Sequence, residues 1–159
     1  MKSLYYYNTS IGKIGIAEEK GLITNICYIS SKIPANIKIQ ETETTREAYK
    51  QISEYLNRER FDFDIPINPN GDKEFQKILI QLMYIPYGEI VTYKDLGLHF
   101  NKHPRAIGTI IHKNPIPIII PCHRVVGSEG KLKGYIGGSD IKRKLLQIEE
   151  VDEWYYRKD

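Results

Sequence analysis

One cysteine of this sequence stands among residues that could activate it as a nucleophile. The segment PIIIPCHRVVG, Pro117 to Gly127, places Cys122 between a proline and a His-Arg pair. A cysteine attacks as its thiolate, and a free thiol with a pKa of ~8.5 is mostly protonated at neutral pH. His123 could accept the thiol proton, through a water or a turn of the backbone, while Glu149 or Glu150 orients the imidazole. The competing interpretation is a buried, inert thiol, because free cysteine behaves as a small hydrophobe.

The backbone on both sides of this thiol contains residues that restrict or free the chain. Asn114, followed by a proline, predicts a turn, and Pro121 fixes φ immediately before Cys122. The thiol is therefore expected on a stiff backbone. Downstream, three glycines between residues 134 and 138 flank Tyr135. Glycine lets a backbone approach a partner closely, so this loop could hold a flat ligand beside one aromatic ring.

The other thiol and the histidines do not extend this candidate site. Cys27 lies in a run of large apolar residues and is predicted to be a core residue. Two cysteines are too few for a disulfide framework, and they form no CxxC pair. The histidines lie in the same half as Cys122, without the spacing of a tetrahedral metal site, at His99, His103, His112 and His123. The sequence therefore predicts no metal and no other cofactor.

Positive charge is concentrated in the second half of the 159 residues, although the net charge is only +3. Residues 1–83 hold eleven Lys and Arg against eleven Asp and Glu. Between Ile90 and Lys144, ten basic residues exceed three acids by seven charges. The ten are Lys94, Lys102, Arg105, Lys113, Arg124, Lys131, Lys133, Lys142, Arg143 and Lys144. Such an excess is typical of a surface that meets DNA or RNA, and equally of a solvated basic face.

The first half must build a sheet covered by a helix. Strands are predicted at Tyr5–Tyr7, Lys13–Ala17 and Leu22–Tyr28, which are rich in Ile and Tyr and separated by glycines. After a polar loop, residues 44–59 repeat apolar side chains at helical spacing, and Thr44 with Glu47 suggests a capping box. The strict alternation of FDFDIPI predicts one more strand over residues 61–67.

The second half reads as helices. We place the domain boundary at NPNG, residues 68–71, which gives domains at 1–68 and 69–159. Asp72 is expected to cap a helix with the apolar stripe Phe75, Ile78, Leu79 and Leu82. Two short helices at 92–100 and 104–113, joined by NKHP, suggest a helix-turn-helix. A last helix, DIKRKLLQIEE, would be capped by Ser139 or Asp140.

The sequence shows no sign of secretion or membrane insertion. The start, MKSLYYYNTSIGK, lacks the apolar core of a signal peptide. No apolar run approaches the ~20 residues that a membrane helix needs. We therefore expect a soluble, cytoplasmic protein.

Together these motifs resemble a known family. The segments NPIPIIIPCHRVVG, GYIGG and LLQIEE resemble the O6-alkylguanine-DNA alkyltransferases. IPYGEIVTYKDL is similar to the start of their helix-turn-helix, PRAIGTIIHKNP to their recognition helix, and TSIGKIGIAEEKGLITNICY to their opening strands. The resemblance implies a two-lobed α+β/α fold: a small ribonuclease H-like domain with an antiparallel sheet and a covering helix, then a mainly helical, winged-helix-like domain with the helix-turn-helix.

The resemblance also implies a role for each matching catalytic residue. Cys122 would accept the alkyl group, His123 would act as a base through a water, and Glu149 would orient that imidazole. Tyr93 would help to protonate the departing guanine. Asn114 would brace the turn that holds the active-site strand.

Contacts to DNA and to the target base follow from the same resemblance. Arg105 would fill the gap that the extruded base leaves in the stack, and Tyr93 would lie by a rotated phosphate. Lys102 and Lys113 are further expected DNA-binding residues. The residues expected to form the base pocket are Val125, Tyr135, Ile136 and Ile111.

The implied activity is direct DNA repair. A monomer would transfer an alkyl group, above all methyl, from O6 of guanine in double-stranded DNA to Cys122, with O4 of thymine as a further candidate. Because a thioether is not hydrolysed, each molecule of this methyltransferase would react once. Two other classes stay open: a non-catalytic helix-turn-helix DNA-binding protein, and a Cys-His hydrolase.

Overall fold

The computed structural model describes residues 1–132 and 134–156, and two units divide the chain. Unit 1 comprises Met1–Gly71 together with Pro115–Ile119. Unit 2 comprises Asp72–Asn114 and the chain from Ile120 onward. The predicted organisation had one boundary, at residues 68–71. In the structure the five residues Pro115–Ile119 group with unit 1, where the N–H of Ile26 donates to the carbonyl of Pro115 (2.8 Å).

Unit 1 is built on a four-stranded sheet in the order β3-β2-β1-β4. The strands β1 (Lys2–Thr9), β2 (Gly12–Glu19) and β3 (Leu22–Tyr28) form an antiparallel meander, which confirms the three predicted strands. The fourth strand, β4 (Ile37–Ile39), pairs in parallel with β1. It lies in the stretch predicted to be a polar loop, because three residues of edge strand leave too little periodicity to detect.

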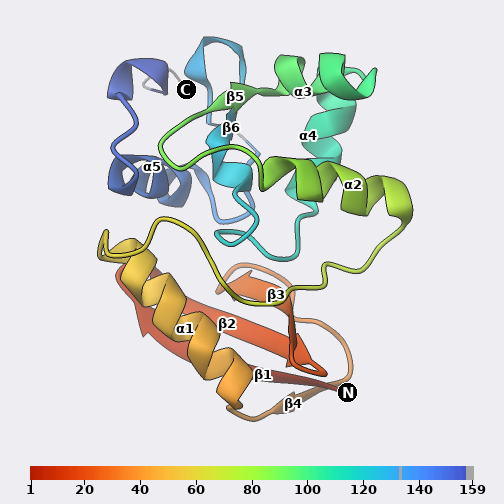
Figure 1. The fold of residues 1–159 in the computed structure, drawn as a ribbon, viewed down its shortest axis with the longest axis vertical. Helices are drawn as coiled ribbons and strands as arrows, with labels where there is room; N and C mark the ends of the chain where they lie inside the picture. Colours follow the sequence, from red (N-terminus) through yellow and green to blue (C-terminus); the bar gives the residue numbers. More distant parts are fainter. Residues whose placement is uncertain (133, 157–159) are drawn as a thin grey trace. The chain divides into compact units, whose positions relative to one another are not determined.

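Helix α1 (Glu43–Leu56) lies across one face of this sheet and buries Ala48, Ile52 and Tyr55 (Figure 1). The helix was predicted correctly, but its capping box was not. Thr42 is the N-cap, and its hydroxyl accepts from the N–H of Thr45 (3.1 Å), whose own hydroxyl accepts from the N–H of Thr42 (2.9 Å). The spacing of three residues is the predicted one, displaced by two positions.

The strand predicted over residues 61–67 is wrong. Only Ile67 makes an isolated bridge, to Ile23, and Phe61 is 60% exposed. The side chain of Gln51 on α1 forms hydrogen bonds with both backbone groups of Asp64. It donates to the carbonyl and accepts from the N–H, each at 2.9 Å. Pro66 has no N–H to give to a ladder, and the segment bonds to the sheet only at its end, where the Pro66 carbonyl accepts from the N–H of Ile23 (3.0 Å).

Unit 2 begins with helix α2 (Lys73–Leu82), capped as predicted by Asp72, whose side chain accepts from the N–H of Phe75 (2.8 Å). Ile78, Leu79 and Leu82 are fully buried, as their helical spacing indicated. The turn after α2 leads to β5 (Val91–Thr92), which pairs in parallel with β6 (Val125–Val126).

Helices α3 (Tyr93–Phe100) and α4 (Pro104–His112) confirm the predicted helix-turn-helix. A capping box of Thr92 and Asp95 starts α3, and Asn101 ends it in the left-handed region (φ 54°). Gly97 faces the connecting turn so closely that a β-carbon there would meet the carbonyl oxygen of Lys102 at 2.5 Å. The tight packing of α3 against this turn therefore requires glycine.

The rest of unit 2 carries the thiol between short elements. The 3-10 turn η1 (Cys122–Arg124) precedes β6, η2 (Ser128–Gly130) follows it, and η3 (Glu153–Tyr155) lies near the chain end. The strands β5 and β6 lie between α5 (Ser139–Ile148) and the α3–α4 pair (Figure 1). The predicted cap of α5 is wrong: Gly138 (φ 91°) is the N-cap, without a side-chain bond, because the chain enters in a conformation that favours glycine.

Candidate active site

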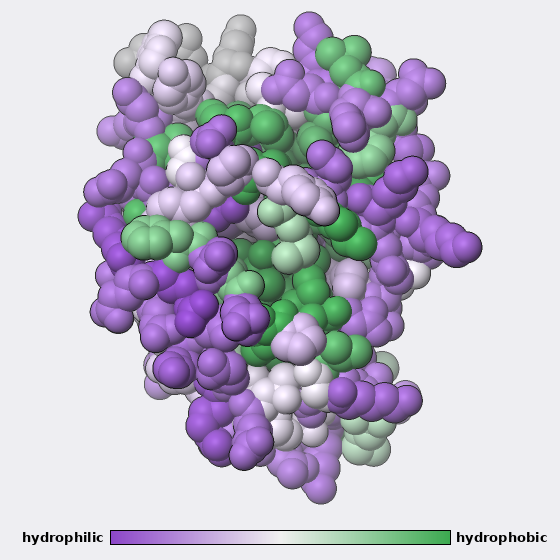
Figure 2. Space-filling view, in the orientation of Figure 1, coloured by the Kyte–Doolittle hydropathy of each residue, from purple (hydrophilic) through white to green (hydrophobic). Residues whose placement is uncertain are grey.

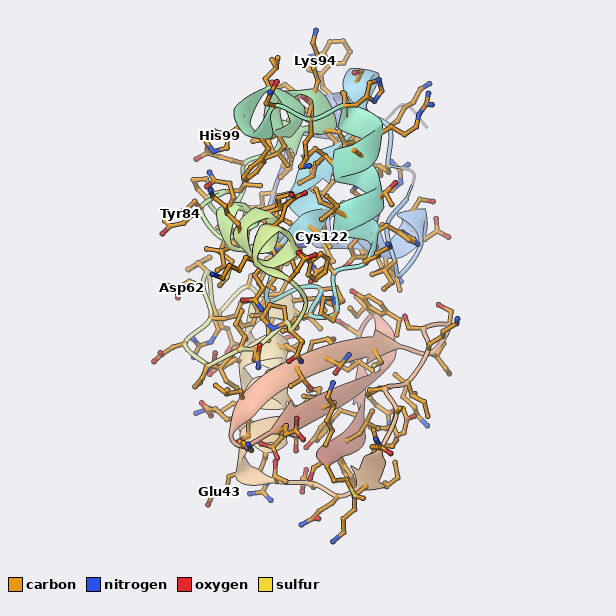
Figure 3. The ribbon with its side chains drawn as sticks, turned by 90° about the vertical axis from the view of Figure 1, so that its right-hand side faces the viewer. Glu43, Asp62, Tyr84, Lys94, His99 and Cys122 are labelled. Carbon is orange, nitrogen blue, oxygen red and sulfur yellow. The ribbon has the colours of Figure 1, made fainter. Side chains whose placement is uncertain are left out.

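Cys122 lies inside unit 2 at the start of η1. The residue is only 3% exposed. Figure 3 shows Cys122 within unit 2, whereas Lys94 points outward at one end of the unit. The preceding Pro121 has φ −80°, and the N–H of Cys122 donates to the carbonyl of Ile120 (2.8 Å). The stiff backbone predicted from the proline is present. Because the thiol is buried and its backbone is restricted, a reacting group must enter the site to meet it.

The surroundings of Cys122 act on its pKa in opposite directions. Burial raises the pKa of the thiol to about 11, while a hydrogen bond from Asn114 and the positive charge of Lys142 lower it. Asn114 is itself fully buried, and its Nδ2 donates to the carbonyl of Ile120 (3.1 Å). The resting cysteine is thus a thiol at neutral pH, next to groups that favour the thiolate.

Glu149 joins the two residues that follow Cys122. Its Oε2 accepts from His123 Nε2 at 2.6 Å and from Arg124 Nη2 at 3.1 Å, and its Oε1 accepts from Arg124 Nε at 2.8 Å. The N–H of Gly88 also donates to Oε1 (2.9 Å). Glu150, the other carboxylate that the sequence allowed, is exposed. Glu149 is therefore the residue that orients His123.

This network sets the charge states of its members. Burial raises the pKa of the Glu149 carboxyl, but the hydrogen bonds from His123 and Arg124 and the positive charge of Arg124 outweigh it and lower the pKa to about 2. Burial also lowers the pKa of His123 below 6.5, and the effect of Glu149 does not fully offset this. At neutral pH, His123 is neutral and donates from Nε2 to an ionised carboxylate. Nδ1 is then the basic nitrogen of the ring.

Two side chains complete the surroundings of the thiol: Tyr93, which is half-buried, and Lys142, which is fully buried. Burial, followed by the charge of Cys122, raises the pKa of the Tyr93 hydroxyl to about 12, so it is a protonated donor at neutral pH. The Lys142 ammonium is fully buried, donates to the carbonyl of Val125 (2.5 Å) and lies 5.7 Å from the centre of the Tyr93 ring.

A groove lies over the helix-turn-helix, with a volume of ≈ 840 Å³. Both helices and the loop after β6 contribute to it. The lining residues are Tyr93, Lys94, His103, Pro104, Arg105, Gly108, Thr109, His112, Lys113, Ser128, Lys131 and Gly134. The surface around α3 is mostly hydrophilic (Figure 2). Tyr93 lines this groove, and ionisation of Cys122 to the thiolate raises the pKa of its hydroxyl, so the two features adjoin at this side chain.

The predicted DNA-binding residues separate into two groups. Arg105 and Lys113 line the groove. Lys102 does not: its ammonium pairs with Glu74 of α2 at 2.7 Å, with a side chain 30% exposed. Of the ten basic residues counted from the sequence, Arg124 and Lys142 are buried, so they add nothing to a basic surface. Lys133 lies outside the described residues.

The four residues predicted to form a base pocket are buried or half-buried. Val125 and Ile111 are buried, Tyr135 is 7% exposed and Ile136 is half-buried. They do not line the groove, although their neighbour Gly134 does. Among the described residues no cluster of three or more His, Cys, Asp and Glu could hold a metal ion. In the same part of the chain no helix is both long and apolar enough to cross a bilayer.

Two family models together match most of the chain. Residues 73–151 match the DNA binding domain of 6-O-methylguanine DNA methyltransferase, and residues 4–69 match its ribonuclease-like domain. The chain belongs to the 6-O-methylguanine DNA methyltransferase family. The predicted family and fold class are therefore confirmed.

Individual members of this methyltransferase family match along nearly their whole length. A methylated-DNA–protein-cysteine methyltransferase of Methanosarcina barkeri is 42% identical over 157 residues, covering 92% of this chain and 98% of the relative. The constitutive enzyme of Bacillus subtilis is 36% identical, with coverages of 92% and 96%. The crystal structure of Mycobacterium tuberculosis OGT in complex with DNA has a TM-score of 0.87 at 31% identity and covers 93% and 92% of the two chains.

Sequence reasoning missed Lys142 in this methyltransferase site and counted it as a surface charge. A helical pattern could have found it. Lys142, Leu145 and Glu149 follow at intervals of three and four, which places them on one face of α5. Leu145 is fully buried, and so are its neighbours on that face. A lysine in such a stripe is expected to turn inward with a specific partner.

Proposed function

We propose that this chain repairs DNA by direct reversal, moving the methyl group of O6-methylguanine to Sγ of Cys122. The observation that carries the proposal is a buried cysteine followed directly by His123 and Arg124, both bonded to the buried Glu149, in a member of this family. Neutral His123 supplies a base, and the thiol supplies the nucleophile. The domain of residues 69–159 would hold the DNA and the acceptor, and residues 1–68 would form a separate sheet domain.

The depth of Cys122 requires the target base to leave the duplex. O6 of guanine faces the interior of double-stranded DNA, and extrusion costs roughly a few kcal/mol, least for a damaged and badly paired base. Arg105 lines the groove on α4 and would fill the space in the stack. Lys113 would contact phosphates. Lys102 would join it by leaving Glu74, since an ion pair at the surface is worth only about 0–1 kcal/mol.

The thiol proton would pass through a water to Nδ1 of His123 as the nucleophile forms. Glu149 holds the ring by Nε2 and stabilises the resulting imidazolium. Asn114 bonds both the thiol and the carbonyl of Ile120, so it braces the turn and favours the thiolate at once. Proton loss and attack therefore belong to one step, because the pKa of about 11 leaves little thiolate at rest.

In the transfer, Sγ would form a bond to the methyl carbon while the bond from that carbon to O6 breaks. The electron pair stays on guanine. Tyr93, held protonated by its pKa of about 12, would donate a proton to the leaving base. The product thioether has no route to hydrolysis in this site, so each molecule reacts once without a cofactor.

The base pocket would read guanine mainly through the backbone. The carbonyls of Cys122 and Val125 would accept from its amino group, and the N–H of Ile136 would donate to O6. The Val125 carbonyl already accepts from Lys142, but a carbonyl oxygen has two lone pairs. Tyr135 and Ile111 would form apolar walls. We propose a monomer that acts on double-stranded DNA inside the cell.

The test is incubation with a duplex oligonucleotide containing O6-methylguanine, followed by intact mass and peptide mapping. We expect one methyl group on Cys122. Cys27, buried in β3 with a pKa raised by burial, is an internal control that should stay unmodified. The Cys122→Ser variant should bind the duplex without removing the methyl group. Intact O6-methylguanine after incubation with the wild type would refute the proposal and favour a protein that only binds DNA.

A further inference from the structure

His112 at the end of α4 contacts a loop that lies far along the chain. Its Nδ1 is 2.6 Å from the carbonyl oxygen of Gly134. A carbonyl can only accept, so Nδ1 must carry the hydrogen, as it does in the Nδ1–H tautomer and in the imidazolium alike. This assigns a direction to the bond: the groove helix donates to the loop.

The loop after η2 is anchored on both sides of this contact. On one side, the N–H of Gly127 donates to the carbonyl of Lys131 (2.8 Å), and Leu132 is fully buried in a cluster that includes Val126 and Leu146. On the other side, the N–H of Gly138 donates to the carbonyl of Tyr135 (3.0 Å) at the start of α5. Between these two anchors, His112 bonds to the backbone carbonyl of Gly134.

Gly134 has no side chain that could pack against neighbouring residues. It lies at φ +87°, and a β-carbon there would have no atom within 4 Å. Its side-chain position contributes no packing, so the location of its peptide depends on hydrogen bonding. The next two residues, Tyr135 and Ile136, are the ones proposed to wall the base pocket and to donate to O6. A shift at Gly134 would therefore be passed directly to them.

We propose that His112 is a positioning residue, which fixes the Gly134–Ile136 backbone against α4 so that the base pocket is formed before guanine arrives. The inference rests on the proposed function for its link to transfer. His112 and Gly134 both line the groove, together with Lys113 and Lys131. The bond thus joins the helix that would hold DNA to the segment that would hold the base.

Two substitutions separate this role from a general effect on the helix. In His112→Asn, the amide nitrogen stands as many bonds from Cα as Nδ1 does, so the donor to Gly134 is kept. In His112→Gln, the amide lies where Nε2 was, and that donor is lost. Glutamine is a better helix former than asparagine. Helix stability alone therefore ranks Gln above Asn, whereas the proposed role ranks Asn above Gln.

The first measurement is amide hydrogen exchange of Tyr135 and Ile136 without DNA. We expect His112→Gln to exchange faster and His112→Asn to match the wild type. The second is the single-turnover transfer rate at saturating duplex and with free O6-benzylguanine. One neutral hydrogen bond corresponds to a rate loss of roughly 2- to 12-fold. We expect that loss for His112→Gln on both substrates, with unchanged affinity for the duplex.

Wild-type exchange and rates in His112→Gln would overturn the inference, and so would equal losses in both variants. A loss of duplex affinity at an unchanged transfer rate would assign His112 to DNA binding instead and would also overturn it. If the wild type transferred no methyl group, the proposed function would fail. The exchange rates would still decide whether His112 holds the loop.

Discussion

Replacing Glu149 by glutamine removes one charge from a fully enclosed network. The carboxylate accepts four hydrogen bonds, from His123, from Gly88 and twice from Arg124. Glutamine has one carbonyl oxygen and one NH₂ group, so in either orientation two of these donors face a donor. The Arg124 guanidinium, with its side chain 8% exposed, loses its counter-ion. Breaking a buried pair on one side costs about 3–5 kcal/mol.

For a chain of this size we expect Glu149→Gln to lower the Tm by roughly 6–20 °C. The control is Glu150→Gln, which removes the same charge one residue later at an exposed position and should stay within about 0.5 kcal/mol of the wild type. Fluorescence of Trp154, the single tryptophan, reports on unit 2, and circular dichroism follows the whole chain. A Tm within 2 °C of the control would refute the reasoning.

Acid supplies an independent check on the same carboxylate. Its pKa is about 2 when folded, against an ordinary 4.5, so ionised Glu149 contributes stability on the order of 3 kcal/mol above pH 4.5. That contribution is lost as the pH falls from 4.5 towards 2, because the folded carboxylate must then be protonated. The gap in stability between the wild type and Glu149→Gln should therefore shrink over this range. A constant gap would show that Glu149 is not ionised in the folded protein.

Three further outcomes follow from the site and the fold. Arg105→Ala should slow repair in duplex DNA far more than transfer from free O6-benzylguanine, and equal losses would argue against the role in the base stack. Because the pKa of His123 lies below 6.5, the transfer rate at pH 6.5 should still exceed half of its value at pH 7.5 and fall further in more acidic buffer; a half-maximal rate above pH 6.5 would contradict a neutral base. Gly97→Ala should destabilise the protein by about 1–3 kcal/mol, since its β-carbon would meet the Lys102 carbonyl at 2.5 Å. Gly108→Ala, with 3.8 Å to the nearest ring atom, should be neutral or stabilising in urea denaturation, and a similar loss in both variants would refute the steric account.

Local signals in the sequence were reliable where short-range physics decides the structure. Two helix starts show this. At Asp72 and at Thr92, the side chain accepts a hydrogen bond from the backbone N–H three residues later. The stiff approach to Cys122 depends on the ring of Pro121. Such features are set within one turn of chain, so residue type and spacing suffice to predict them.

Predictions from local sequence failed where a residue far along the chain supplied the bonding partner. The alternation at residues 61–67 predicted a strand, but Gln51 offered both backbone bonds of Asp64 a nearer partner. The edge strand β4 was missed because its three residues carry no pattern that predicts pairing with β1. The inward turn of Lys142 was likewise invisible to a count of charges.

The sequence by itself determined which chemistry is available: a thiol between a proline and a histidine, and a helix-turn-helix with an arginine on its second helix. Only the tertiary structure decided how these parts act on one another. It selected Glu149 over Glu150, buried Arg124 beside it, and joined His112 to Gly134. These choices depend on distances between elements far apart in the chain, because burial and neighbouring charge, which no local pattern contains, set the pKa values and the bonds of a site.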